Sequence, residues 1–126
     1  MDAQRASQWY AAWNARDAEQ IAALYADDVE FASPFVAALG FSQDGVIHGK
    51  AQFTAYVQSA LPRVRDMHFE PQAICAGCRG HTLIYRNQSG VLVAESHEFD
   101  FRGLIAKASA AYEVNPADQD KNPSGA

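Results

Sequence analysis

The stretch WYAAWNARD at residues 9–17, followed by IAALYADDVEF at residues 21–31, decides the fold. In its first part, Trp9 and Trp13 continue an apolar stripe whose members recur every three or four residues. That spacing is typical of an amphipathic helix, which we expect over residues 2–15.

The segments that follow predict two more helices and a strand between them. Asp17 can accept hydrogen bonds from the free amides of a short helix, expected from Ala18 to about Tyr25. Residues 29–34 alternate like a strand that ends at a proline. Residues 35–49 hold three glycines and show no helical period, so we expect a long loop or irregular flap there. Helical spacing returns over residues 50–61.

The second half of the chain reads as short strands separated by turns. The expected strands are residues 67–76, 80–87, 91–101 and 104–114. Links this short require antiparallel neighbours. The sequence therefore predicts an α+β fold, with three N-terminal helices packed in a strongly curved mixed or antiparallel sheet. Such a sheet forms a cone with a closed-ended apolar pocket. We expect one domain over residues 1–114, and a disordered polar tail over 115–126.

Composition narrows the classes of partner. The chain has 126 residues and a formal charge of -5, which disfavours nucleic acid as a ligand. We expect a cytoplasmic protein that contacts no membrane, because the apolar runs are too short to span one and no basic and apolar leader opens the chain. Cys75 and Cys78 form a single CxxC pair just before a strand, which favours incidental thiols over a metal or redox centre. No metal and no cofactor is expected.

The stretches at residues 9–17 and 21–31, with Ser33-Pro34 and His48-Gly49, resemble the nuclear transport factor 2-like superfamily, which includes SnoaL-like and ketosteroid isomerase-like proteins. The resemblance covers about residues 5–114. It implies the cone fold, and it leaves the reaction open because one fold hosts many functions.

Two enzyme types within this superfamily are compared with the sequence. In ketosteroid isomerases a carboxylate base and an oxyanion hole of tyrosine and protonated aspartate do the chemistry; the matching positions here are Ser33, Trp9 and His97. The usual mechanism is therefore not expected. Limonene epoxide hydrolases need an Asp, Arg, Asp arrangement, for which Arg86 and Asp100 are the nearest candidates. Asp100 has the opposite strand parity to His97 and should point outward.

Glu95 and His97 are the candidate catalytic residues. They share one strand face with Val93, Phe99 and Phe101, which we predict to be the inner face. A carboxylate beside an imidazole can fix its tautomer, so His97 is the expected proton-transfer group and Glu95 its orienting partner. The alternative is a core histidine bonded to a backbone carbonyl, with Glu95 at a solvated rim.

A set of mainly aromatic residues is expected to line the pocket, although an aromatic stripe is often plain core. Its members are Trp9, Trp13, Tyr25, Ser33, Phe53, Tyr56, Phe99 and Tyr112. The last strand offers Ala106, Ala108 and Ala110 on the face of Tyr112, and small side chains opposite large aromatics leave space.

These residues support two hypotheses of function. The first is a small-molecule enzyme that uses cofactor-free acid-base chemistry on an apolar ligand, as an isomerase, a polyketide-cyclase-like enzyme, a dehydratase or a hydrolase. The second is a non-catalytic ligand-binding or dimerisation module of the same fold. In both cases a homodimer through the sheet is expected, with Leu83, Tyr85 and Leu92 as a possible outer patch.

Overall fold

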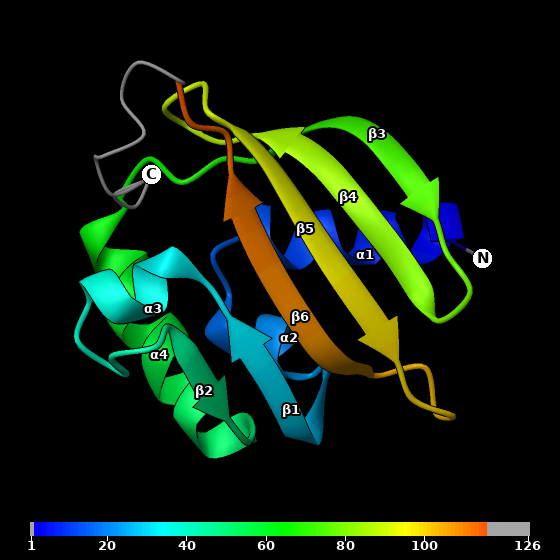
Figure 1. Ribbon diagram of the computed structural model, residues 1–126, viewed down its shortest axis with the longest axis horizontal. Helices are drawn as coiled ribbons and strands as arrows, with labels where there is room; N and C mark the ends of the chain where they lie inside the picture. Colours follow the sequence, from blue (N-terminus) through cyan, green and yellow to red (C-terminus); the bar gives the residue numbers. More distant parts are fainter. Residues whose placement is uncertain (1, 116–126) are drawn as a thin grey trace.

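The computed structural model describes residues 2–115 (Figure 1). The helices are α1 (Asp2–Asn14), α2 (Ala18–Ala22), α3 (Pro34–Ala38) and α4 (Lys50–Arg63). The strands are β1 (Tyr25–Ala32), β2 (Val46–His48), β3 (Glu70–Ala76), β4 (Gly80–Arg86), β5 (Leu92–Phe99) and β6 (Ile105–Tyr112). Apart from residue 115, the tail that we predict to be disordered lies outside the described residues.

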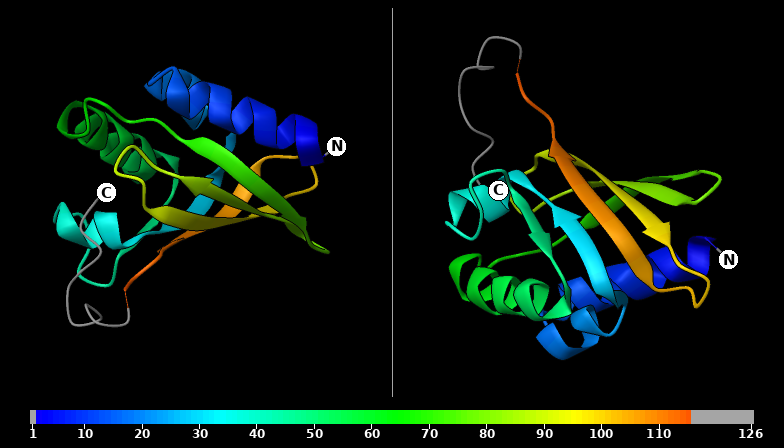
Figure 2. Two further views of the ribbon diagram at one scale, coloured as in Figure 1. Left: turned by 90° about the horizontal axis from the view of Figure 1, so that it is seen from above. Right: turned by 60° about the horizontal axis from the view of Figure 1, so that its bottom comes forward.

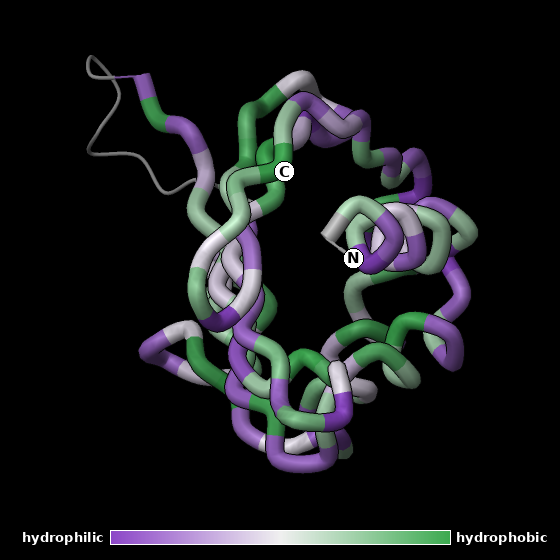
Figure 3. The backbone as a smooth tube through the Cα atoms, turned by 90° about the vertical axis from the view of Figure 1, so that its right-hand side faces the viewer, coloured by the Kyte–Doolittle hydropathy of each residue, from purple (hydrophilic) through white to green (hydrophobic). Residues whose placement is uncertain are grey.

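The six strands form one curved, unclosed mixed sheet in the order β2-β1-β6-β5-β4-β3. β1 runs parallel to β6, while every other neighbouring pair is antiparallel. Helices α1, α2 and α4 lie on one face of this sheet (Figure 2). Figure 3 shows α1 end-on, on the opposite side of the interior from the strands. The predicted α+β class, with helices packed in a curved sheet, is confirmed.

Helix α1 packs its aromatic stripe against the sheet, as its spacing predicts. Trp9 and Trp13 are both buried, and the Trp9 indole stacks on Phe69 with ring centroids 5.5 Å apart. Asp17 caps α2 by accepting from the amides of Glu19 and Gln20, at 3.1 Å each. The opening stretch therefore folds as its pattern indicates.

Strand β1 begins earlier than predicted. Tyr25, which we placed at the end of the second helix, is the first residue of the strand and pairs with Ile105 of β6. The helix ends at Ala22 because pairing with β6 takes over from local helical spacing, a case of tertiary structure overriding propensity.

The segment 35–49 is more regular than the predicted loop. Ser33 caps the short helix α3 through its hydroxyl, which accepts from the amide of Phe35 at 3.2 Å, and Pro34 occupies the first turn. Strand β2 then pairs with β1. A helix of five residues and a strand of three are too short to produce a readable period, although Ser33-Pro34 carried the helix-start signal.

The predicted outer patch is wrong for its two members on β4, while its third member, Leu92, begins β5 and is partly exposed. Leu83 and Tyr85 are 0% and 2% exposed, because they face the helices along with the inner residues of β5. Leu83 pairs with Glu95, and Tyr85 with Val93, so these neighbours share one side of the sheet. Phe101 is also misplaced by the sequence: the strand ends at Phe99, and Phe101 is 94% exposed in the turn that follows.

Candidate functional site

Glu95 and His97 both point to the inner face of β5, as their spacing predicts. The side chain of Glu95 is 4% exposed and that of His97 is fully buried. Burying a carboxylate is costly unless hydrogen bonds and partners replace its water. The surroundings of Glu95 therefore decide what this pair can do.

A continuous chain of hydrogen bonds joins four side chains on β4 and β5. The Tyr85 hydroxyl donates to Glu95 Oε1 at 3.1 Å. His97 Nε2 lies 3.2 Å from Glu95 Oε2, and His97 Nδ1 lies 2.9 Å from His81 Nε2. All four side chains are buried. The chain of hydrogen bonds therefore runs from Tyr85 through Glu95 and His97 to His81, near the start of β4.

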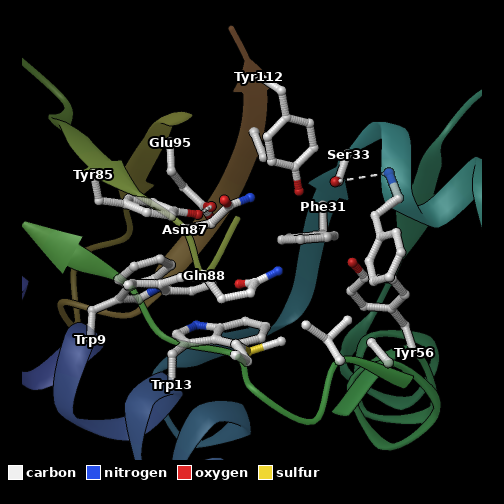
Figure 4. A pocket seen from close by; sticks show the side chains of 16 residues that line it. Trp9, Trp13, Phe31, Ser33, Tyr56, Tyr85, Asn87, Gln88, Glu95 and Tyr112 are labelled. Atoms are coloured by element: carbon white, nitrogen blue, oxygen red, sulfur yellow. Dashed lines mark hydrogen bonds between the residues drawn. The ribbon is translucent and has the colours of Figure 1, made fainter. Parts of the chain in front are cut away.

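A mainly aromatic cavity with a volume of about 50 Å³, called the main cavity below, lies on the Glu95 side of this chain. Figure 4 shows Glu95 and Tyr85 on one side, with Trp9 and Trp13 below them. Since about 10–15 Å³ holds one water, the cavity admits a few waters or a small chemical group as it stands. A larger ligand requires the lining side chains to move.

Hydroxyl groups lie on the opposite side of the cavity. Tyr56 of α4, Tyr112 of β6 and Ser33, which lies between β1 and α3, belong to the lining (Figure 4). Burial raises the pKa of Tyr56 and Tyr112, and a hydrogen bond with Ser33 acts against that rise in each. These phenols are neutral donors at ordinary pH. A ligand between the walls would meet a carboxylate on one side and hydroxyl donors on the other.

Glu95 interacts electrostatically with all five tyrosines of the chain. Burial raises the pKa of each one, and the negative charge of Glu95 contributes to the rise in every case. For Tyr10 the pKa reaches about 12. The carboxylate therefore acts on all phenols that surround the site.

The residues around the cavity opening are partly exposed. Phe35, Val64, Met67 and Gln88 all line the cavity, and each keeps some contact with solvent. Met67 is an unbranched, adaptable side chain, so it can move without a large strain. A ligand would enter the main cavity on this side.

The predicted pocket residues divide into two groups. Trp9, Trp13, Ser33, Tyr56, Tyr112 and Glu95 line the main cavity. Tyr25, Phe53, Phe99 and His97 do not. Tyr25 and Phe53 pack on each other with centroids 4.1 Å apart, and the Tyr25 hydroxyl accepts from Trp9 Nε1 at 2.9 Å.

Several lining residues were missed by the sequence analysis. They include Ala60, Phe69, Tyr85, Asn87 and Gln88. His81 was also missed as a partner of His97. Strand β4 alternates between two sets of residues, each with one aliphatic member, so its own pattern did not show which set faces inward. The two sets are His81, Leu83, Tyr85 and Thr82, Ile84, Arg86. The three alanines were placed on the correct strand, and Ala110 lines the cavity.

Other candidate chemistry does not assemble. Arg86 is exposed and donates to the carbonyl of Gly90, while Asp100 accepts from the backbone of the β5–β6 turn. Within residues 2–115 no three His, Cys, Asp or Glu side chains are grouped to hold a metal ion. Cys75 and Cys78 are both exposed free thiols. No helix in that same range is long and apolar enough to cross a membrane.

Comparisons place this geometry among known folds. The SnoaL-like domain model matches residues 6–107. A SnoaL-like protein of unknown function from Burkholderia thailandensis is 34% identical with a TM-score of 0.84, over 90% of this chain and 94% of that one. A proposed SnoaL-like isomerase from Agrobacterium tumefaciens is 14% identical, with a TM-score of 0.71, over 90% and 97% of the two chains.

A proposed polyketide cyclase from Sinorhizobium meliloti is 12% identical, with a TM-score of 0.70, over 86% of this chain and 94% of that one. At such low identity, this structure and the Agrobacterium one share the fold alone with the present chain. Among curated proteins, none matches the sequence.

Proposed function

Since this chain belongs to the SnoaL-like domain family, we propose that it is a small-molecule enzyme that uses cofactor-free acid-base chemistry on an apolar carbonyl compound. The reaction we propose begins with proton transfer from the carbon next to the carbonyl group. The observation that carries the proposal is the carboxylate of Glu95, buried on the wall of a mainly aromatic cavity. The isomerase and cyclase names of the Agrobacterium and Sinorhizobium structures are compatible with such chemistry.

In this proposal Glu95 is the catalytic base, and His97 positions it. The sequence predicts His97 as the proton-transfer group. In the structure His97 does not line the main cavity; it lines another cavity and contacts Glu95 Oε2 through Nε2. Glu95 lines the main cavity and is fixed at both oxygens. The hydroxyls of Tyr56 and Tyr112 across the cavity can donate to a developing enolate oxygen. Donors that are already in place stabilise such charge without reorganisation.

The proposal is tested by the isomerisation of cyclohex-3-enone to its conjugated isomer, a reaction that requires proton transfer next to a carbonyl. Ultraviolet absorbance follows the product. Replacing the carboxylate in Glu95→Gln should lower kcat by a factor on the order of 10² or more, the usual contribution of a general base. Glu98→Gln is the matched control because Glu98 lies on the same strand and has the opposite parity.

Equal rates for Glu95→Gln and the wild-type protein would refute the assignment of Glu95. Absence of turnover by the wild-type protein, with this ketone and larger homologues, would refute the carbonyl proton-transfer reaction itself. Circular dichroism of both variants distinguishes a chemical effect from misfolding.

The second candidate is a non-catalytic ligand-binding or dimerisation module. The observation that favours it is the exposure of β3, where all seven residues are exposed and Ile74 is 43% exposed. A homodimer through the sheet would cover such residues. Sedimentation equilibrium tests this pairing: a monomer at all concentrations would exclude it, and a dimer weakened by Ile74→Lys would support it. Neither result of the sedimentation experiment affects the interpretation of the Glu95→Gln rate measurement.

A further inference from the structure

Asn87 is the first residue after β4, and it is buried, with 8% of its surface exposed. Its side chain continues the inner row of the strand, because it has the same parity as Leu83 and Tyr85. Asn87 also lines the main cavity. Figure 4 shows the nitrogen end of its carboxamide directed into the cavity, from the same side as Glu95. A polar group in this place faces whatever occupies the cavity.

The turn between β4 and β5 fixes the orientation of this carboxamide. Asn87 Oδ1 accepts from the backbone amide of Ser89 at 3.0 Å and from that of Val91 at 3.1 Å. Backbone amides only donate, so the atom that they contact must be the oxygen, and the other atom is the nitrogen. Within residues 2–115 the side chain of Asn87 bonds to the protein through Oδ1 alone. The two N–H bonds on Nδ2 therefore remain for a ligand.

The strand register places Asn87 and Tyr112 at the same end of the main cavity. Val93 of β5 pairs with Tyr85 on one side and with Tyr112 on the other. Asn87 is the next inner residue after Tyr85, toward the β4–β5 turn. Glu95 is the next inner residue after Val93, away from that turn. A carbonyl compound whose acidic carbon faces Glu95 can thus direct its oxygen toward Asn87 and Tyr112.

We propose that Asn87 is a further catalytic residue, whose carboxamide donates a hydrogen bond to the carbonyl oxygen of the ligand. This inference rests on the proposed function of Glu95 as the base. It assigns to Asn87, together with Tyr112, the stabilisation of the negative charge that forms on that oxygen. It also defines how the ligand lies: the ketone oxygen points to the β4–β5 turn, and the acidic C–H bond faces Glu95.

The reaction moves one negative charge from Glu95 to the ligand oxygen and back. Glu95 first takes a proton from the carbon next to the carbonyl group, and the electron pair of that C–H bond forms the enolate. Hydrogen bonds from Asn87 and Tyr112 are stronger to the charged enolate oxygen than to the neutral carbonyl group. Glu95 then returns the proton to the far carbon of the enolate, which gives the conjugated ketone. Asn87 keeps both of its protons throughout.

The anchored geometry of Asn87 suits this role. A donor that is already oriented stabilises charge without reorganising in the transition state. The amides of Ser89 and Val91 hold the carboxamide in place before a ligand enters. The alternative is that Asn87 serves only the turn, as asparagines often do. The two roles use different atoms, Nδ2 and Oδ1, so substitutions can separate them.

Asn87→Ser separates the two roles in the isomerisation of cyclohex-3-enone. A serine hydroxyl can accept from the Ser89 amide, as in related turns, but it lacks the carboxamide nitrogen. The value of kcat should fall by a factor on the order of 10², the usual cost of removing one such donor, while KM changes much less. Gly90→Ala is the matched control and should keep the wild-type kcat. It strains the same turn, because φ of Gly90 is 77°, and a Cβ there meets nothing within 4 Å.

The outcomes separate this inference from the proposed function. Equal losses of kcat in Asn87→Ser and Gly90→Ala would show that Asn87 serves the turn alone, and would overturn the proposal. Wild-type kcat in Asn87→Ser, together with loss of turnover in Glu95→Gln, would overturn the role of Asn87 and leave the base in place. Full turnover in Glu95→Gln would overturn the proposed function and the role of Asn87 with it.

Asn87→Asp keeps the proposal testable if Asn87→Ser does not fold. Aspartate retains an oxygen acceptor of the same shape for the amides of Ser89 and Val91, so the turn and the urea unfolding midpoint should be kept. It has no N–H donor, and its charge repels the enolate, so kcat should fall at least as far as in Asn87→Ser. A folded Asn87→Asp protein with wild-type kcat would overturn the proposal.

Discussion

Filling the main cavity from β6 should stabilise the protein and lower the proposed activity. Ala110 is buried, lines the cavity and lies directly opposite Glu95 in the sheet. The substitution Ala110→Val adds two methyl groups at this position. If the cavity is a ligand site, the added groups occupy the space that the ligand needs.

The size of the effect follows from the cavity volume. At about 24 cal/mol for each Å³ of empty space, a cavity of about 50 Å³ corresponds to about 1.2 kcal/mol. Ala110→Val should therefore raise the free energy of unfolding by about 1 kcal/mol, which is a few degrees in Tm. Each added methyl in a ligand pocket should also lower kcat/KM for the cyclohex-3-enone reaction by about tenfold or more.

Urea unfolding followed by circular dichroism measures the stability change. The control is Ala111→Val, because Ala111 is the exposed neighbour on β6 and gains the same strand propensity without filling the cavity. The increase in the free energy of unfolding should be larger for Ala110→Val than for this control. A loss of stability in Ala110→Val would show that the space between β5, β6 and α1 is already packed, and it would refute the cavity as a ligand site.

Three further predictions use other parts of the fold. Gly80→Ala should cost about 2 kcal/mol or more in urea unfolding, because a Cβ there would lie 1.8 Å from the His97 carbonyl oxygen, whereas Gly77→Ala should be tolerated. Ser33→Ala should lower stability by about 1 kcal/mol through loss of the α3 cap, and an unchanged unfolding midpoint would contradict this. Raised phenol pKa values stabilise the fold fully below pH 10, and that contribution is lost as the pH rises through the folded values, to about 12 for Tyr10. Tyrosinate absorbance should accordingly appear together with unfolding, and ionisation of a folded protein near pH 10 would show that the phenols are not buried.

The parts of the fold that the sequence predicts well are those in which local pattern and tertiary contact agree. The stripe of α1 faces the sheet because Trp9 and Trp13 recur at helical spacing, and the same faces are buried in the structure. Glu95 and His97 share the inner face of β5 because strand side chains alternate. Both inferences need only the period of one element.

The parts that it misses depend on where elements meet. Tyr25 belongs to β1 because its backbone pairs with Ile105, eighty residues later in the chain, which no local pattern contains. Parity within β4 was visible, but the choice of inner face depended on pairing with β5. The position of His97, which contacts Glu95 but does not line the main cavity, also depends on contacts between elements. Its distance from the cavity is set by how α1 crosses the strands, with Trp9 packed against the His97 ring at 5.2 Å.

Burying the hydrogen-bonded chain of Glu95, His97 and His81 in the core costs more free energy than burying apolar side chains there would. Apolar side chains of similar volume often stabilise a protein more than a buried polar network does, because desolvation offsets much of the attraction between the groups. Here the polar groups also lie between two cavities, one on each side, and the main cavity is lined by aromatic rings. A purely structural network would need neither cavity. The combination of a buried carboxylate and hydroxyl donors across the main cavity is what acid-base chemistry on a carbonyl compound requires: a base, and a wall that stabilises the developing charge.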